Sequence, residues 1–161
     1  MIVNSTRFGP VETPEDKIIT MAKPILGFEE FKRFVLIEID EIQPFMWLQA
    51  VDEPAVAFLV VNPVLVYPDY RIEINAMEVG EIKIDDVNNV ETYVIVTIGE
   101  DPTEISVNLQ GPIMINTENN LAKQLVLVNS EYKIKFPLMS QMPVGETAKA
   151  APTRENEMAG V

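Results

Sequence analysis

Carboxylates are the side chains of this sequence whose number and spacing could carry chemistry. Nine of them fall between positions 73 and 104, where Lys83 is the one opposing base. Such a run could hold a cation, supply an acid–base pair, or form a docking surface for a basic partner. Because exposed and buried residues alternate along strands, we expect several of these acids to share one face. The nine are Glu73, Glu78, Glu81, Asp85, Asp86, Glu91, Glu100, Asp101 and Glu104.

The catalytic and metal-binding interpretations of this run have little support. The stretch from Asp85 to Asn89 lacks the alternating ligands and the sixth-position glycine of a calcium loop. Nothing else in the chain indicates the sugar chemistry of a glycosidase carboxylate pair. The chain has no histidine and no cysteine, which removes the usual general base and every thiolate site. We predict no catalytic residues, no metal and no cofactor, while a docking face and a merely solvated face both remain open.

The overall charge narrows the class of partner. The formal net charge is −13, from 12 basic and 25 acidic residues, and no basic cluster is longer than Lys32-Arg33. This charge disfavours nucleic acids and anionic membranes as direct partners, and it favours a basic protein. Residues 1–10 lack the features of a signal peptide, and the longest apolar stretch, Ala55 to Val61, is too short to span a bilayer. The sequence therefore predicts a cytoplasmic monomer.

Aromatic and amide side chains form the second set of candidates. Trp47 is the single tryptophan, and we favour a place in the core over a role as an interface anchor. The run Tyr67-Pro68-Asp69-Tyr70 is a turn by composition, and for Tyr70 core packing and partner contact are both open. Asn108, Gln110 and Gln124 lie inside apolar runs, where we expect each amide to satisfy a strand end or bulge.

Strand patterns dominate the chain and set these residues on a β scaffold. Short runs rich in Val, Ile, Tyr and Phe alternate with Pro, Asn, Asp and Gly. The pattern predicts an all-β, mostly antiparallel fold, a compact barrel-like or sandwich single domain with one or two short helical turns. The expected strands are Phe34–Ile39, Ala55–Val61, Arg71–Ile74, Tyr93–Ile98, Ile105–Leu109, Ile113–Ile115, and a closing hairpin of Leu125–Val128 with Tyr132–Phe136.

Helix signals and the chain end complete the outline. Thr13 and Pro14 resemble a capped helix start, so a turn or two is expected near Glu15 to Ile18, and another near Asp85 to Val90. From Met139 the composition loses its β-branched runs and cannot bury enough apolar surface to offset chain ordering. We predict a β domain over 1–138 and a flexible C-terminal tail over 139–161.

Several short motifs follow one another in a distinctive order and spacing. They are Arg7-Phe8-Gly9, Leu26-Gly27-Phe28-Glu29, Phe34-Val35-Leu36, Pro44-Phe45 with Trp47-Leu48-Gln49, Ala57-Phe58 with Asn62-Pro63, Pro68-Asp69-Tyr70, Val107 to Ile113, and Lys123-Gln124. Each motif alone is weak, but together, over roughly residues 2–136, they resemble the FliW family of flagellar assembly factors. Two positions depart from the family pattern: Pro24-Ile25 stands where a glycine turn is expected, and Gly111 where alanine is more usual.

The resemblance implies a partner-switching regulator without enzymatic activity. Proteins of this family bind flagellin and also CsrA, an RNA-binding repressor of flagellin translation, and so relieve repression. The alternative is a cytoplasmic export chaperone for flagellar subunits without a regulatory role. The candidate partner-binding residues are Trp47, Asp69, Tyr70, Glu73, Glu81, Asp85 and Asp86. The motif residues expected to be structural are Gly27, Gln49, Asn62, Pro63, Asn108, Pro112 and Gln124.

Overall fold

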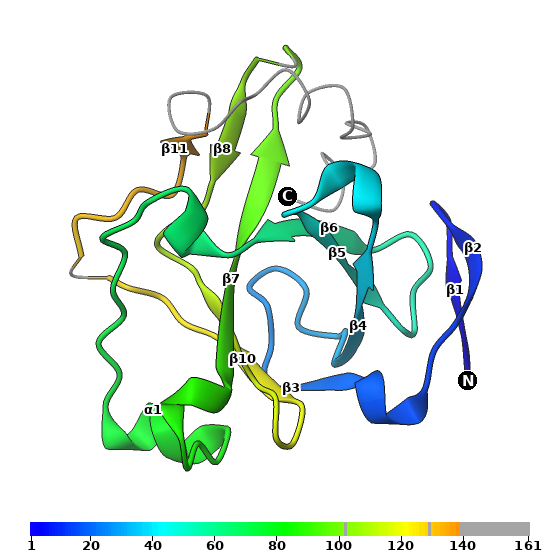
Figure 1. The fold of residues 1–161 in the computed structure, drawn as a ribbon, viewed down its shortest axis with the longest axis horizontal. Coiled ribbons are helices and arrows are strands. Elements are labelled where there is room, and N and C mark those ends of the chain that lie inside the picture. Colours follow the sequence, from blue (N-terminus) through cyan, green and yellow to red (C-terminus); the bar gives the residue numbers. More distant parts are fainter. Residues whose placement is uncertain (102, 129, 139–161) are drawn as a thin grey trace.

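Strands are the predominant regular structure in the computed structural model, which describes residues 1–101, 103–128 and 130–138 and contains one short α-helix among them (Figure 1). The segment 139–161, for which the sequence predicts a flexible tail, lies outside the described residues.

Seven strands close into a barrel, because β7 pairs with β6 on one side and with β9 on the other. Neighbours around the barrel are antiparallel, except for β3 and β10, which are parallel. The all-β, barrel-like, mostly antiparallel fold predicted from the sequence is confirmed. In order around the barrel the strands are β7 (Val90–Ile98), β6 (Ala57–Val61), β5 (Met46–Ala50), β4 (Arg33–Glu38), β3 (Ile19–Lys23), β10 (Leu121–Gln124) and β9 (Ile113–Asn116).

Smaller elements cover the outside of the barrel. Strand β8 (Ile105–Val107) pairs with β7, and β11 (Phe136–Pro137) pairs with β8, while β1 (Ile2–Ser5) and β2 (Gly9–Glu12) form a separate hairpin. In Figure 1 the β7–β8 hairpin and helix α1 lie at opposite ends of the molecule. The helical elements are α1 (Ala76–Glu81) and the 3-10 turns η1 (Glu15–Lys17), η2 (Asp40–Ile42), η3 (Pro63–Leu65) and η4 (Val87–Asn89).

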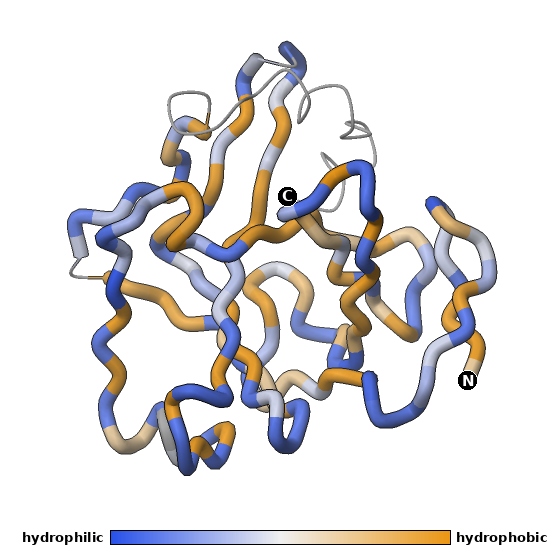
Figure 2. Tube along the Cα trace, in the orientation of Figure 1, coloured by the Kyte–Doolittle hydropathy of each residue, from blue (hydrophilic) through white to orange (hydrophobic). Residues whose placement is uncertain are grey.

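Strands β5, β6 and β7 are buried on both faces. Phe58 and Val60 of β6 belong to a cluster with members from all seven barrel strands, which is the barrel interior. Leu59 and Val61 point the other way, into a second cluster covered by β8 and the segment after β6. A strand buried on both faces needs a continuous apolar run, which explains why residues 57–61 are entirely apolar. Figure 2 shows hydrophobic chain along these strands and a hydrophilic tip on the β7–β8 hairpin.

Five predicted strands are present within a few residues of the expected bounds, whereas the one predicted over Arg71–Ile74 is absent. Its burial alternates as expected, with Ile72 and Ile74 half-buried, but no described strand pairs with it. The backbone N–H of Arg71 instead donates to the Tyr132 hydroxyl at 2.8 Å. Alternation thus indicated the buried side chains correctly, but it does not supply a pairing partner. The five strands found are β4, β6, β7, β8 and β9.

The predicted closing hairpin of Leu125–Val128 with Tyr132–Phe136 is wrong. The strand lies earlier, as β10. The described residues after Gln124 make isolated hydrogen bonds, such as the one from the Leu127 N–H to the Gln110 carbonyl at 2.8 Å. Phe136 pairs with β8 rather than with the preceding run. The apolar residues there cover the barrel and do not pair as two strands. Tertiary packing, and not local composition, decides between these two outcomes.

The short turns near residues 15–18 and 85–90 are present as η1 and η4, but Thr13 does not cap the first of them. Its hydroxyl donates to the Val11 carbonyl at 3.3 Å, and Pro14 occupies the cap position without a side-chain bond. Helix α1 was not expected. It begins with a reciprocal capping box between Asn75 and Glu78, a signal present in the sequence as Asn-x-x-Glu.

Candidate functional site

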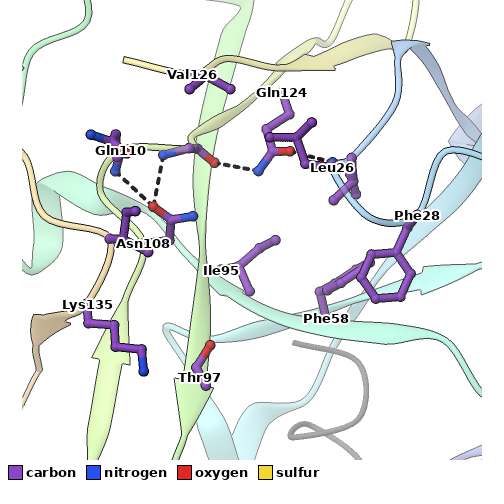
Figure 3. A pocket seen from close by; sticks show the side chains of 13 residues that line it. Leu26, Phe28, Phe58, Ile95, Thr97, Asn108, Gln110, Gln124, Val126 and Lys135 are labelled. Atoms are coloured by element: carbon purple, nitrogen blue, oxygen red, sulfur yellow. Dashed lines mark hydrogen bonds between the residues drawn. The ribbon is translucent and has the colours of Figure 1, made fainter. Parts of the chain in front are cut away.

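A groove of about 530 Å³ opens on the barrel wall beside β7 (Figure 3). We call it the apolar groove, because Lys135 is the one charged residue among the described residues that line it. The lining residues are Ile25, Leu26, Phe28, Phe58, Ile95, Thr97, Asn108, Gln110, Gly111, Gln124, Val126, Ile134 and Lys135.

Two motif amides hold the wall of the apolar groove. The Asn108 Oδ1 accepts from the backbone N–H of Gln110 at 3.0 Å and of Gly111 at 3.1 Å. The Gln124 Nε2 donates to the Gly111 carbonyl at 3.0 Å, and its Oε1 accepts from the Leu26 N–H at 2.8 Å. Figure 3 shows this chain of bonds crossing from one loop to the next. Each amide satisfies backbone groups at a strand end, and together they tie three loops into one fixed surface.

Glycine at position 111 fits between those amides. A Cβ added there would lie 3.0 Å from both the Asn108 Nδ2 and the Gln124 Nε2, which is closer than side chains normally approach. The residue that departs from the family pattern in the sequence therefore sits where the two amides leave little room.

The rim of the apolar groove exposes large apolar side chains. Leu26 is 62 % exposed, Ile134 59 % and Val126 47 %, although they come from three separate segments. Deeper in, Phe28 packs edge-on against Phe58 with ring centroids 4.9 Å apart. A concave, apolar surface with a few fixed polar groups suits the apolar face of a peptide segment, and it offers no acid–base pair for catalysis.

The acidic run does not share one face. Five of the nine acids lie on or near α1, whereas Glu100, Asp101 and Glu104 lie at the β7–β8 tip, at the other end of the molecule (Figure 1). The sequence predicted only that several of the acids would share one face, and β7 separates the nine into two groups along its length. We call the first group the α1 acids: Glu73, Glu78, Glu81, Asp85 and Asp86.

Glu81 is neutralised by two lysines that are remote in sequence. Its carboxylate accepts from the Lys123 ammonium and lies 3.2 Å from the Lys23 Nζ. Lys123 is buried, so this pair satisfies a charge that would otherwise be costly to bury. The hydrogen bond from Lys123, and then that from Lys23, lower the pKa of Glu81 below its usual value. Lys83 is therefore not the cation that matters at the α1 acids.

Replacing Glu81 with glutamine is expected to make stability less dependent on pH. A carboxyl whose pKa is lowered by folding stabilises the fold above its unfolded pKa and stops doing so as pH falls through the folded pKa. Urea unfolding at several pH values should thus show wild type more stable than Glu81→Gln at neutral pH, with the gap narrowing in acid. A gap that stays constant down to acidic pH would argue against the ion pair.

The other sequence candidates occupy different environments. Glu73, Asp85 and Asp69 are exposed, and Asp86 is exposed but caps η4 by accepting from the Asn88 N–H at 2.9 Å.

Trp47 is 1 % exposed and lies beneath the Arg7 guanidinium, whose Cζ is 3.8 Å from the centroid of the Trp47 ring. Both it and Tyr70 are core residues.

Tyr70 is 7 % exposed, and its hydroxyl donates to the Leu109 carbonyl at 2.6 Å. Burial, and then the neighbouring Tyr132, raise the pKa of the Tyr70 phenol. Tyr70 therefore anchors the segment after β6 to the connection between β8 and β9 as a neutral donor.

The remaining motif residues shape turns. Gly27 has a φ of +87°, which favours glycine, and Asn62 caps η3 by accepting from the Val64 N–H at 3.1 Å, with Pro63 in the first helical position. Gln49 is fully buried, and its Nε2 lies 3.1–3.4 Å from four carbonyls around the β5–β6 turn. The Pro112 carbonyl accepts from the Leu125 N–H at 2.8 Å.

Comparison with known proteins fixes the family. The family model described as "FliW protein" matches residues 2–138. This chain belongs to the FliW family. The flagellar assembly factor FliW of Geobacter sulfurreducens (strain ATCC 51573 / DSM 12127 / PCA) is 44 % identical over 141 residues, covering 88 % of each chain. That of Caldanaerobacter subterraneus subsp. tengcongensis is 38 % identical over 143 residues, covering 88 % of this chain and 95 % of the relative.

A solved structure gives the same result for the fold. The crystal structure of a flagellar assembly factor FliW superposes with a TM-score of 0.80 at 33 % identity, covering 86 % of this chain and 96 % of that one. The FliW resemblance predicted from the motifs is confirmed.

None of the described helices has the length and apolar character needed to cross a bilayer. Within the described ranges, no group of three or more acidic side chains converges in a way that could hold a metal ion.

Sequence reasoning did not select the rim of the apolar groove in this FliW-family chain. Leu26 and Phe28 flank a turn glycine, and Ile134 lies between two lysines, so each looks like a scattered apolar residue. The available signal was a large apolar side chain at a turn, where polar residues are the rule. What the sequence cannot give is their convergence, because it depends on how the loops close over β7.

Proposed function

We propose that this chain is a cytoplasmic flagellar assembly factor that binds flagellin and the repressor CsrA, and that it antagonises CsrA to relieve repression of flagellin translation. The observation that carries the proposal is the FliW match over residues 2–138, since the relatives are named flagellar assembly factors. In this scheme the chain acts by recognition, and export of flagellin frees it to capture CsrA.

The two partners call for different surfaces. Flagellin's terminal segments are apolar helices in the assembled filament, and the apolar groove suits the apolar face of such a helix. CsrA binds RNA, so its cationic surface is complementary to a chain of net charge −13. The chain need not copy the RNA, because binding elsewhere on CsrA can lower RNA affinity through coupling.

Calorimetric titration with the purified partners tests the proposal. We expect flagellin and CsrA each to bind with an affinity between nanomolar and micromolar, and CsrA binding to weaken as salt is added. Heat with neither partner at low ionic strength would end the proposal. Binding of flagellin alone would favour the export chaperone, which the apolar groove also suits.

Charge reversal at two α1 acids is expected to weaken CsrA binding. Glu73 and Asp85 are the members to change, because they are exposed and neither forms a salt bridge within the described part of the chain. Glu81 is already paired, and Asp86 holds η4. The Glu73→Lys/Asp85→Lys variant should bind CsrA roughly ten-fold more weakly, mainly through slower association.

The matched control carries the same change of charge at the opposite end of the barrel. Glu100→Lys/Glu104→Lys should leave CsrA affinity within about two-fold at physiological salt, because the tip lies at the other end of the molecule from the α1 acids and salt screens exposed charges that are far apart. Equal losses in both variants would mean that only net charge matters. No loss in either would place the CsrA interface elsewhere.

A further inference from the structure

A second groove, of about 860 Å³, lies between β4, the segment from β2 through η1, and the β9–β10 turn. We call it the acidic groove, and it shares no lining residue with the apolar groove. Its chemistry is set by an open strand edge and by carboxylates that form no salt bridge with the residues the structure describes.

The open edge belongs to β4. Strand β3 pairs with β4 only at Ile19 with Phe34 and at Thr20 with Arg33. On its other side β4 stays paired with β5 as far as Glu38. The chain before Ile19 turns away in η1, so no described strand pairs with residues 35–38 on the β3 side.

The register identifies the backbone groups that this edge presents. The Lys32 carbonyl accepts from the Met21 N–H, so the backbone polar groups of Lys32 point toward β3. The Arg33 carbonyl accepts from the Val51 N–H, so the backbone polar groups of Arg33 point toward the β5 side. Backbone direction alternates along a strand, so Leu36 and Glu38 also face the β3 side. The acidic groove is lined by all four residues 35–38, as expected of a groove that follows the strand edge rather than one face.

Negative charge surrounds this edge. Five carboxylates and one ammonium, that of Lys17, line the groove, and none of these carboxylates forms a salt bridge with another described residue. The Tyr93 hydroxyl donates to the Glu91 Oε1 at 3.0 Å, and burial, then Glu91 and then Glu38, raise the pKa of that phenol. Glu91 on β7 and Glu38 on β4 therefore both place negative charge near the Tyr93 hydroxyl. The five are Glu12, Asp16, Glu38, Glu91 and Glu118.

The walls of the acidic groove are held in place by hydrogen bonds. The Asn120 Nδ2 donates to the Asp16 carbonyl at 2.5 Å, linking the β9–β10 turn to η1. The Asn89 Nδ2 donates to the Glu118 Oε1 at 2.7 Å, and the Thr117 hydroxyl donates to the Asn89 carbonyl at 2.7 Å. A site fixed before binding loses less entropy when a ligand enters.

We propose that the acidic groove receives an extended, cationic segment of a protein partner, which adds as a strand to the free edge of β4. Its backbone pairs with Leu36 and Glu38, and its lysines or arginines meet the carboxylates of Glu38 and Glu91. A second copy of this chain fits poorly, because the same acids would face each other across the new pair. The proposal goes beyond the binding of flagellin and CsrA, since it holds whichever protein carries the segment.

Fluorescence anisotropy with a labelled synthetic peptide tests this site in the full chain. The probe is Lys-Val-Lys-Thr-Lys-Val-Lys, which combines strand propensity with charge. We expect micromolar binding, and about ten-fold weaker binding to Glu38→Gln/Glu91→Gln. The control Glu73→Gln/Asp85→Asn removes the same charge at the α1 acids and should change affinity less than about two-fold. Equal losses in the two variants would overturn the proposal.

A second peptide separates strand addition from simple charge attraction. The first peptide, N-methylated at its first valine and its third lysine, keeps the charge but lacks one backbone donor on each side of the strand, so it should bind at least about five-fold more weakly. Hydrogen exchange read by NMR on the wild-type chain needs no variant, and there the first peptide should slow the Leu36 and Glu38 amides. Equal binding of both peptides, or unchanged exchange at saturation, would contradict strand addition.

Discussion

Trp47→Ala is expected to lower the free energy of unfolding by about 3–5 kcal/mol, the usual range for removing a buried large aromatic side chain. Trp47 is 1 % exposed within the cluster between β5–β7 and β8, so the lost side chain leaves a cavity. Trp47 also supports the loop between β1 and β2. The Phe8 ring packs edge-on against the Trp47 ring with centroids 6.4 Å apart, and the Arg7 guanidinium covers the Trp47 ring. Urea unfolding followed by far-UV circular dichroism measures the change without relying on tryptophan fluorescence.

The conservative variant Trp47→Phe controls for aromatic packing. Trp47→Phe should lower the free energy of unfolding by less than half as much as Trp47→Ala, because the phenyl ring still fills most of the cavity. Arg7→Met should lower the free energy of unfolding by a still smaller amount, about 0.5–2 kcal/mol, as expected for loss of a partly desolvated cation–π contact. A Trp47→Ala cost below about 1.5 kcal/mol would mean that the site collapses around the missing ring, and would contradict its role as a core anchor.

Leu26→Asp/Ile134→Asp is expected to weaken flagellin binding by at least about 30-fold, because it places two carboxylates where an apolar helix face would be buried. Both side chains are more than half exposed on the rim of the apolar groove, so the free chain should keep its stability. Calorimetry with flagellin measures the affinity, and circular dichroism checks the fold of the variant.

The chain offers a closely matched control for this variant. Val64 and Leu65 are exposed apolar residues, 48 % and 51 % exposed, that lie in η3 outside the apolar groove. Val64→Asp/Leu65→Asp adds the same charge and removes similar apolar area, so its flagellin affinity should stay within about three-fold of wild type. The reverse ranking of the two variants would move the flagellin surface to η3.

Local pattern determined the strands well and their partners poorly. The run 57–61 is apolar throughout, which is typical of a strand buried on both faces, and β6 is such a strand. Arg71–Ile74 shows the right alternation, yet none of the described strands pairs with it. The parallel pairing of β10 with β3 joins residues about a hundred positions apart, and no local signal specifies it.

The candidate sites show the same division. The hydrogen bonds of Asn108 and Gln124 follow from elementary chemistry, since an amide inside an apolar run must be satisfied. The lysines that neutralise Glu81 come from β3 and β10, and a count of nearby charges in the sequence overlooks both. The two grooves form where loops from separate parts of the chain meet, which is why the sequence did not indicate the position of either one.

The anisotropy of a labelled flagellin leader RNA bound to CsrA tests the proposed partner switch most directly. Adding this chain should release the RNA and lower the anisotropy, and adding flagellin afterwards should restore it as the chain is drawn away from CsrA. An RNA signal that stays unchanged at saturating concentrations of the chain, with CsrA shown to be active, would contradict the account.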